Sequence, residues 1–136
     1  MGTTVAAIHF SEGYANLCHV GDSRIYRIRD DKIERLTEDH SIAANVLSKA
    51  LGTSPSVEAT WRVEPAAPGE CFVLCTDGVH GLIKDEEILD IVRRNAPDYQ
   101  RACTELIALA NDRGGRDNST ALVLGYVLGK NRAVEQ

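Results

Sequence analysis

The sequence lacks any apolar run long enough to cross a membrane, and its N-terminus lacks the basic and apolar regions of a signal peptide. It also lacks a dense cluster of Lys and Arg, and its net charge of −5 is a poor match to nucleic acid. We therefore expect a cytoplasmic protein that binds neither membranes nor nucleic acid. The basic residues Arg24, Arg27 and Arg29 alternate with apolar residues, which predicts the solvated face of a strand.

Cysteine is scarce, and no two of the four cysteines form a C-x-x-C pair. All four lie in apolar surroundings, and the spacing of Cys71 and Cys75 places both on one face of a strand. This arrangement predicts buried free thiols rather than zinc ligands or disulfides, in keeping with a cytoplasmic chain.

The chain has no internal repeat and no low-complexity segment, and its 136 residues are enough for one domain with a real core. A hydrophobic content of 43% and a charged content of 26% are ordinary for a globular protein. We expect a domain over residues 1–128, followed by a polar tail over residues 129–136.

Short strands dominate the first part of the chain. The pattern predicts strands over residues 3–10, 14–20, 25–29 and 32–37, joined by tight turns. No gap between them is long enough for a crossover helix, so they are expected to form an antiparallel meander rather than a parallel sheet.

The second part mixes helices with strands. Ser41 is expected to cap a helix that ends at Leu51, because apolar residues recur there at helical spacing. Asp85 is expected to cap another helix. The remaining elements are a helix over about residues 98–111 and strands over residues 57–63, 71–75 and 119–128. The predicted fold class is therefore α+β, with helices packed on the face of an antiparallel sheet.

Three acids stand where a predicted strand meets a turn: Asp22, Asp77 and Asp117. Any one of them could simply form an Asx turn, and for Asp22 alone that is the favoured interpretation. Taken together, three carboxylates on strand ends favour a site for Mg²⁺ or Mn²⁺, which prefer oxygen ligands. A cation there would lower the pKa of a water molecule and supply hydroxide at neutral pH.

The histidines are weaker candidates for chemistry. His80 is interpreted as a loop or packing residue, and His19, inside a predicted strand, as part of the core. Asp39 and His40 are adjacent like a catalytic couple, but neighbours in an extended segment point to opposite faces. We interpret them as a structural turn.

Six short motifs of the sequence resemble motifs of a known family, the bacterial PP2C-like (PPM) serine/threonine phosphatases. They come in the family's order and cover nearly the whole chain: Met1–Thr4 (M-G-T-T), Val20–Arg24 (V-G-D-S-R), Leu36–Ser41 (L-T-E-D-H-S), Asn45–Gly52 (N-V-L-S-K-A-L-G), Leu74–Gly78 (L-C-T-D-G) and Asp117–Ala121 (D-N-S-T-A).

The resemblance implies a β-sandwich of antiparallel sheets flanked by helices, with a metal centre of Mn²⁺ or Mg²⁺ between the sheets. By position in the motifs, Asp77 and Asp117 would hold one metal, and Asp22 would hold an additional, weaker one. Gly78 and Asn118 would support the loops that carry these acids. No side chain is implied as the nucleophile, because in this family a metal-bound water attacks the phosphorus of phosphoserine or phosphothreonine in a protein substrate.

The chain departs from the family in two ways. The family's first strands, with an Arg that grips phosphate and a D-G-x-G acid that bridges two metals, are not in this sequence, so the sandwich is expected to be incomplete at the N-terminus. The family's flap is also missing, since three residues alone separate Ser41 from Asn45. The missing flap puts substrate choice and the additional metal in question.

Three hypotheses follow from these departures. The chain is part of a phosphatase that is inactive without its bridging acid, or a catalytically dead module that binds or regulates a partner, or a weak divalent-ion-binding domain without phosphate chemistry. Missing strands leave unpaired edges and apolar surface. We therefore expect pairing, either as a homodimer by strand exchange or with a missing N-terminal segment.

Overall fold

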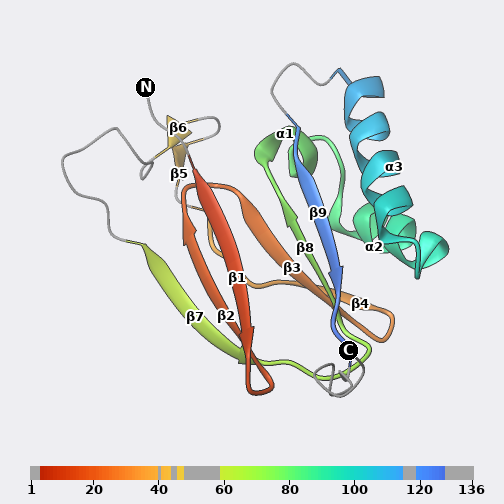
Figure 1. The fold of residues 1–136 in the computed structure, drawn as a ribbon. Coiled ribbons are helices and arrows are strands. Elements are labelled where there is room, and N and C mark those ends of the chain that lie inside the picture. The colour runs from red at the N-terminus through yellow and green to blue at the C-terminus, as the bar shows by residue number, and fades with distance from the viewer. Residues whose placement is uncertain (1–3, 40, 44–45, 48–58, 115–118, 128–136) are drawn as a thin grey trace, which may run out of the picture.

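The computed structural model describes residues 4–39, 41–43, 46–47, 59–114 and 119–127 (Figure 1). The expected polar tail over residues 129–136 lies outside these ranges. Within them, every helix is too short or too polar to cross a membrane.

One sheet has the strand order β1-β2-β7 and is antiparallel throughout. Its strands are β1 (Val5–Ser11), β2 (Tyr14–Val20) and β7 (Thr60–Pro65). The turn between β1 and β2 has two residues, Glu12 at φ 50° and Gly13 at φ 81°. Positive φ at both central positions twists a hairpin in the same sense as its strands, so the predicted turn is confirmed.

The second sheet has the order β4-β3-β8-β9 and is also antiparallel. Its strands are β3 (Arg24–Arg29), β4 (Lys32–Arg35), β8 (Cys71–Cys75) and β9 (Ala121–Gly125). The predicted single meander is therefore wrong, because β2 and β3 belong to different sheets. The chain changes sheets at Gly21, whose φ of 102° an L side chain rarely adopts, and the two hairpins then bury their apolar faces against each other.

Helices cover the outer face of the second sheet (Figure 1). They are α1 (Asp77–His80), α2 (Asp85–Asn95) and α3 (Tyr99–Asp112). The cap of α3 is Asp98, whose carboxylate accepts a hydrogen bond from the Arg101 amide at 3.1 Å. The cap position of α2 is Lys84 rather than the expected Asp85, and Glu87 reaches back to the Lys84 amide at 3.0 Å.

The predicted helix from Ser41 to Leu51 is wrong where the structure describes it. Residues Ser41–Ala43 form β5, which pairs antiparallel with β6 (Val46–Leu47). Apolar residues at 42, 46 and 47 fit a helical stripe, but β-branched Ile and Val also favour extended backbone, and a partner strand so close in sequence satisfies the same hydrogen bonds. Residues 48–51 lie outside the described ranges.

Two apolar cores share strand β8. On the helix side, Cys71, Val73 and Cys75 pack with α2 and α3. Between the sheets, Phe72 and Leu74 pack with apolar residues of β2 and β3. Every residue of β8 is buried, and the free thiols of Cys71 and Cys75 share one face as predicted. A strand buried on both faces fixes the position of whatever follows it.

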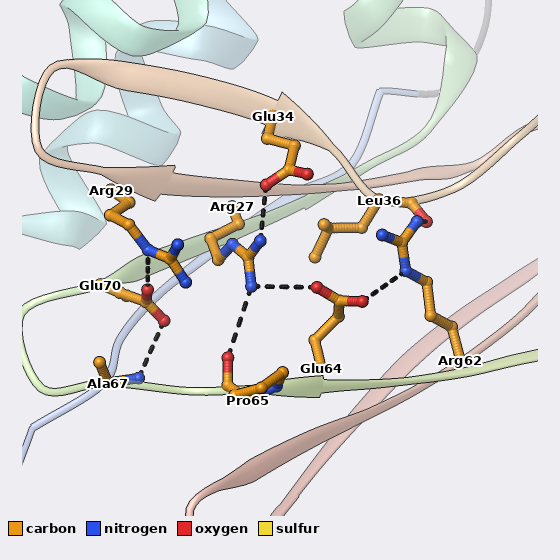
Figure 2. Close-up of polar contacts among 9 residues, drawn as sticks. All are labelled: Arg27, Arg29, Glu34, Leu36, Arg62, Glu64, Pro65, Ala67 and Glu70. Atoms are coloured by element: carbon orange, nitrogen blue, oxygen red, sulfur yellow. Dashed lines mark hydrogen bonds and ion pairs between the residues drawn. The ribbon is translucent and has the colours of Figure 1, made fainter.

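A charged cluster joins the two sheets at one side of the sandwich (Figure 2). The guanidinium of Arg27 on β3 donates to Glu34 of β4 at 2.6 Å and lies 3.2 Å from Glu64 of β7. Glu64 in turn accepts from Arg62 at 2.8 Å. The Arg27 side chain is 7% exposed, so the predicted solvated strand face is wrong for Arg27, whereas Arg29 is 52% exposed. Arg27 and Arg29 share one face of β3, and at Arg27 that face looks into the sandwich.

The same side holds a second buried carboxylate. Glu70 is 3% exposed, accepts a hydrogen bond from the Ala67 amide at 2.9 Å and pairs with Arg29 (Figure 2). A buried acid of this kind is tolerable because it is both paired and hydrogen-bonded. It fixes the turn that leads into β8.

We predict that Glu64→Gln destabilises the fold more than the matched change Glu34→Gln. Glu64 is 17% exposed and contacts two arginines, whereas Glu34 is 53% exposed and contacts one. We expect a loss of about 1–3 kcal/mol for Glu64→Gln and about 0–1 kcal/mol for Glu34→Gln in urea unfolding at neutral pH. Equal losses would show that the bridge between the sheets does not depend on Glu64.

Candidate metal centre

Asp77 stands at the end of β8, as the sequence predicts, but begins a single helical turn instead of a loop. The amides of Val79 and His80 donate to the Thr76 carbonyl at 2.9 and 3.2 Å, which winds α1 tightly around the end of the strand. Gly81 closes the turn, where a Cβ would lie 2.6 Å from the Asp77 carbonyl oxygen. Glycine is therefore required at this position for the backbone to approach so closely.

The segment that leads into β9 is tied to the same turn. The Thr120 amide donates to the Thr76 hydroxyl at 3.0 Å, and the Thr76 amide donates to the Thr120 carbonyl at 3.1 Å. The Ser119 hydroxyl lies 3.3 Å from the Gly78 carbonyl oxygen. Ser119 follows the predicted acid Asp117 and its neighbour Asn118, both of which lie outside the described residues.

Asp22 is brought to this turn by a contact across the fold. The His80 ring nitrogen Nε2 lies 2.6 Å from the Asp22 carbonyl oxygen and must donate, because a carbonyl can only accept. Burial and the nearby positive charge of Arg24 lower the pKa of His80, so the imidazole is neutral at neutral pH. His80 therefore joins the Asp77 turn to the turn that carries Asp22.

The Asp22 carboxylate is affected by its burial and by the nearby Asp77. Burial raises the pKa of Asp22, and the negative charge of Asp77 raises it further. Both side chains are half-buried, so solvent screens this repulsion incompletely. Two like charges held together at a cost are stabilised when a cation lies between them.

An ion pair anchors the strand that leaves the Asp22 turn. Arg24 donates to both carboxylate oxygens of Asp39, from Nε at 3.0 Å and from Nη2 at 2.7 Å. A third bond runs from Nη1 to the Tyr26 hydroxyl at 3.0 Å. Burial alone would raise the pKa of Asp39, but the hydrogen bonds from Arg24 outweigh it and hold the pKa below its usual value. Asp39 thus forms an ion pair instead of the predicted structural turn, and His40 lies outside the described residues.

The donor set suits a hard divalent cation. Asp22 and Asp77 supply carboxylate oxygens from rigid positions, and Mg²⁺ and Mn²⁺ bind through a few carboxylates with water completing the shell. Among the residues that the structure describes, no three metal-binding side chains gather in one place. The described part of the candidate centre is thus a pair of acids.

Sequence reasoning missed the part that His80 plays. The sequence offered a histidine three residues after Asp77, but no pattern links it to a carbonyl 58 positions earlier. His19, expected in the core, is 3% exposed and therefore buried as predicted.

Comparisons with known proteins identify the family of the chain. The family model described as "Protein phosphatase 2C" matches residues 1–123. A "Serine/threonine phosphatase stp" from Listeria innocua is 30% identical to this chain over an alignment of 143 residues. The alignment covers 91% of this chain and 56% of that protein. The chain therefore belongs to the protein phosphatase 2C family, and it spans about half the length of this curated relative.

Solved structures show the same fold. The Mycobacterium tuberculosis serine/threonine phosphatase PstP/Ppp superposes with a TM-score of 0.86 at 30% identity, and the match covers 94% of this chain and 61% of that one. The catalytic domain of a PstP in complex with two manganese ions superposes with a TM-score of 0.84 at 32% identity, covering 93% and 60% of the two chains. The fold is thus an incomplete α+β domain of the PP2C type.

We predict that Asp39→Asn weakens the fold in a pH-dependent way. The pKa of Asp39 is lowered in the folded state, so its ion pair stabilises the protein above the usual value of 3.8 and this stabilisation is lost as pH falls through the lower folded value. We expect a loss of about 1–3 kcal/mol at neutral pH, shrinking below about pH 4, in urea unfolding.

The matched control for that variant is Asp31→Asn. Asp31 is 89% exposed and pairs with Arg93 on the surface, so its loss should leave the free energy of unfolding near that of the wild type. A penalty for Asp39→Asn that stays constant from neutral pH to pH values below the usual pKa of Asp would contradict the prediction.

Proposed function

We propose that this chain supplies metal-binding carboxylates of a PP2C-type serine/threonine phosphatase, acting on phosphoserine or phosphothreonine in proteins. The observation that carries the proposal is the convergence of Asp22 and Asp77, which the contact between His80 and the Asp22 carbonyl brings about. Membership of the protein phosphatase 2C family supports the reaction class.

Each acid has a separate part in the proposal. Asp77, at the end of the fully buried β8, is the most rigidly held ligand, with Gly78 in the turn that supports it. Asp117 is assigned with it from the family motif, with Asn118 positioning its loop. Asp22 takes an additional, weaker cation. The bonds of Thr120 and Ser119 tie the start of β9 to the Asp77 turn.

Mn²⁺ or Mg²⁺ is the proposed cofactor. Carboxylate oxygens are the ligands that these ions prefer, and the structure of a related PstP in complex with two manganese ions supports the choice. When bound, such a cation acidifies water and polarises a phosphoryl group. Other residues of the chain keep the two acids in position. His80 stays neutral and joins the turns that carry Asp22 and Asp77, and the Arg24–Asp39 ion pair anchors the strand after Asp22. The free state of the four cysteines supports a cytoplasmic location.

The test of this function is Mn²⁺ binding together with phosphate release. We expect the chain to bind Mn²⁺ in titration calorimetry and Asp77→Asn to weaken that binding by at least about tenfold, because a carboxylate ligand is lost. With a phosphothreonine peptide we expect little turnover from this chain alone, since it spans about half the length of a curated relative.

The matched control is Asp90→Asn, an exposed acid of α2 that pairs with Arg94 and should leave Mn²⁺ binding unchanged. Mn²⁺-dependent phosphate release that Asp77→Asn abolishes would support the phosphatase function and overturn the expected inactivity. Mn²⁺ binding with the same affinity in the wild type and in Asp77→Asn would overturn the proposed site.

A further inference from the structure

The turns that carry Asp22 and Asp77 lie where one antiparallel ladder ends. Strand β3 pairs with β8, and the last pair of that ladder is Arg24 with Cys75. Asp22 and Asp77 each stand two residues beyond this pair, so they would be direct partners if the ladder continued. Like charges opposite each other on neighbouring strands are destabilising, and the charge of Asp77 does raise the pKa of Asp22.

The backbone leaves the ladder at this point on both strands. Before Arg24, Gly21 has a φ of 102° and the chain passes to the other sheet, where Val20 pairs with Val5. After Cys75, the chain winds into α1. The β3–β8 ladder therefore pairs no residues beyond this point, and the backbone carbonyls that follow need donors from elsewhere.

The side chain of His80 is the donor to the Asp22 carbonyl. The His80 amide donates to the Thr76 carbonyl at 3.2 Å, and the Gly81 amide donates to the Asp77 carbonyl at 2.8 Å. The backbone on either side of the imidazole is thus fixed, and Nε2 reaches the Asp22 carbonyl oxygen at 2.6 Å. A side chain therefore makes the contact between the two segments where their ladder has ended.

The two acids depend on His80 unequally. Asp77 follows a strand that is buried throughout, and Thr76 beside it exchanges two hydrogen bonds with Thr120. These contacts hold the Asp77 turn without the imidazole. The Asp22 carbonyl, in contrast, is tied to α1 by the bond from His80.

The contacts of the residues after Asp22 lead away from α1. The Ser23 hydroxyl lies 2.8 Å from the hydroxyl of Thr4, which precedes β1. Arg24 binds the carboxylate of Asp39. Neither contact joins the Asp22 turn to the Asp77 turn, so the spacing of the two carboxylates depends on His80.

We infer that His80 is a positioning residue for the cation that Asp22 takes, and that the N–H donor at Nε2 is its contribution. The inference rests on the proposed function, in which Asp22 takes an additional, weaker cation. His80 acts on the Asp22 backbone and needs no contact with the cation. Loss of a residue that orients a metal ligand lowers metal affinity about 10–100-fold. Because β8 holds the Asp77 turn, this loss falls on the Asp22 cation.

The test is Mn²⁺ titration calorimetry on the full 136-residue chain, with Asp22→Asn as the reference that identifies the weaker binding event. His80→Phe keeps an aromatic ring but removes the donor. We expect it to weaken the event that Asp22→Asn removes by about 10–100-fold. The event that depends on Asp77 should be unchanged.

A pair of amide variants separates positioning from packing. His80→Gln carries an N–H donor at about the reach of Nε2 and should restore the affinity of the wild type. His80→Asn carries the same amide on a shorter side chain and should bind as weakly as His80→Phe. The matched control is His9→Phe, an exposed histidine of β1, which should leave both events unchanged.

The outcomes distinguish the inference from the proposed function. Equal affinity of His80→Phe and the wild type for the Asp22 event would overturn the inference alone. A loss that His80→Gln does not restore would also overturn it, because packing of the ring would then explain the loss. If His80→Phe does not fold, equal affinities of His80→Gln and His80→Asn would overturn it. Mn²⁺ binding that neither Asp77→Asn nor Asp22→Asn weakens would overturn the proposed site, and the inference with it.

Discussion

The burial of strand β8 on both of its faces is the constraint on which the rest of the structure depends. Its odd-numbered residues pack against the helices and its even-numbered residues against the other sheet, so one short strand belongs to both cores. A strand held in this way cannot slip in register without moving apolar side chains out of both cores at once. Asp77, which stands just beyond this strand, is held rigidly as a result, and the proposed role of metal ligand requires such rigidity of a short side chain.

The second acid depends on contacts made far from it in sequence. The sandwich brings the β2–β3 turn beside α1, and His80 then holds the Asp22 carbonyl. On the other side of the sandwich, Arg27 and Glu64 connect the sheets through buried charges. That side is closed by paired charges, whereas the hollow between β1 and β9 is lined by Thr and Ser together with apolar residues and holds no charged side chain.

Much of the local structure could be predicted from the sequence, because short-range signals decide it. The hairpin at Gly13, the buried strand before Asp77 and the start of α3 at Asp98 follow from turn residues, apolar patterning and a capping side chain. The helix expected from Ser41 failed because periodicity over so few residues does not distinguish a helical stripe from paired strands. The solvated face expected for Arg27 failed because alternation tells which residues share a face, not which way that face looks.

The sequence by itself determined the α+β class and the strand-end positions of Asp22 and Asp77, and its motifs indicated the phosphatase family. Each of these depends on residues that lie close together along the chain. The tertiary structure alone decided that the two hairpins belong to different sheets, that His80 joins the two acid-bearing turns and that Arg27 is buried between the sheets. Such features depend on contacts between residues up to 58 positions apart, which arise only when the apolar faces of the sheets pack together.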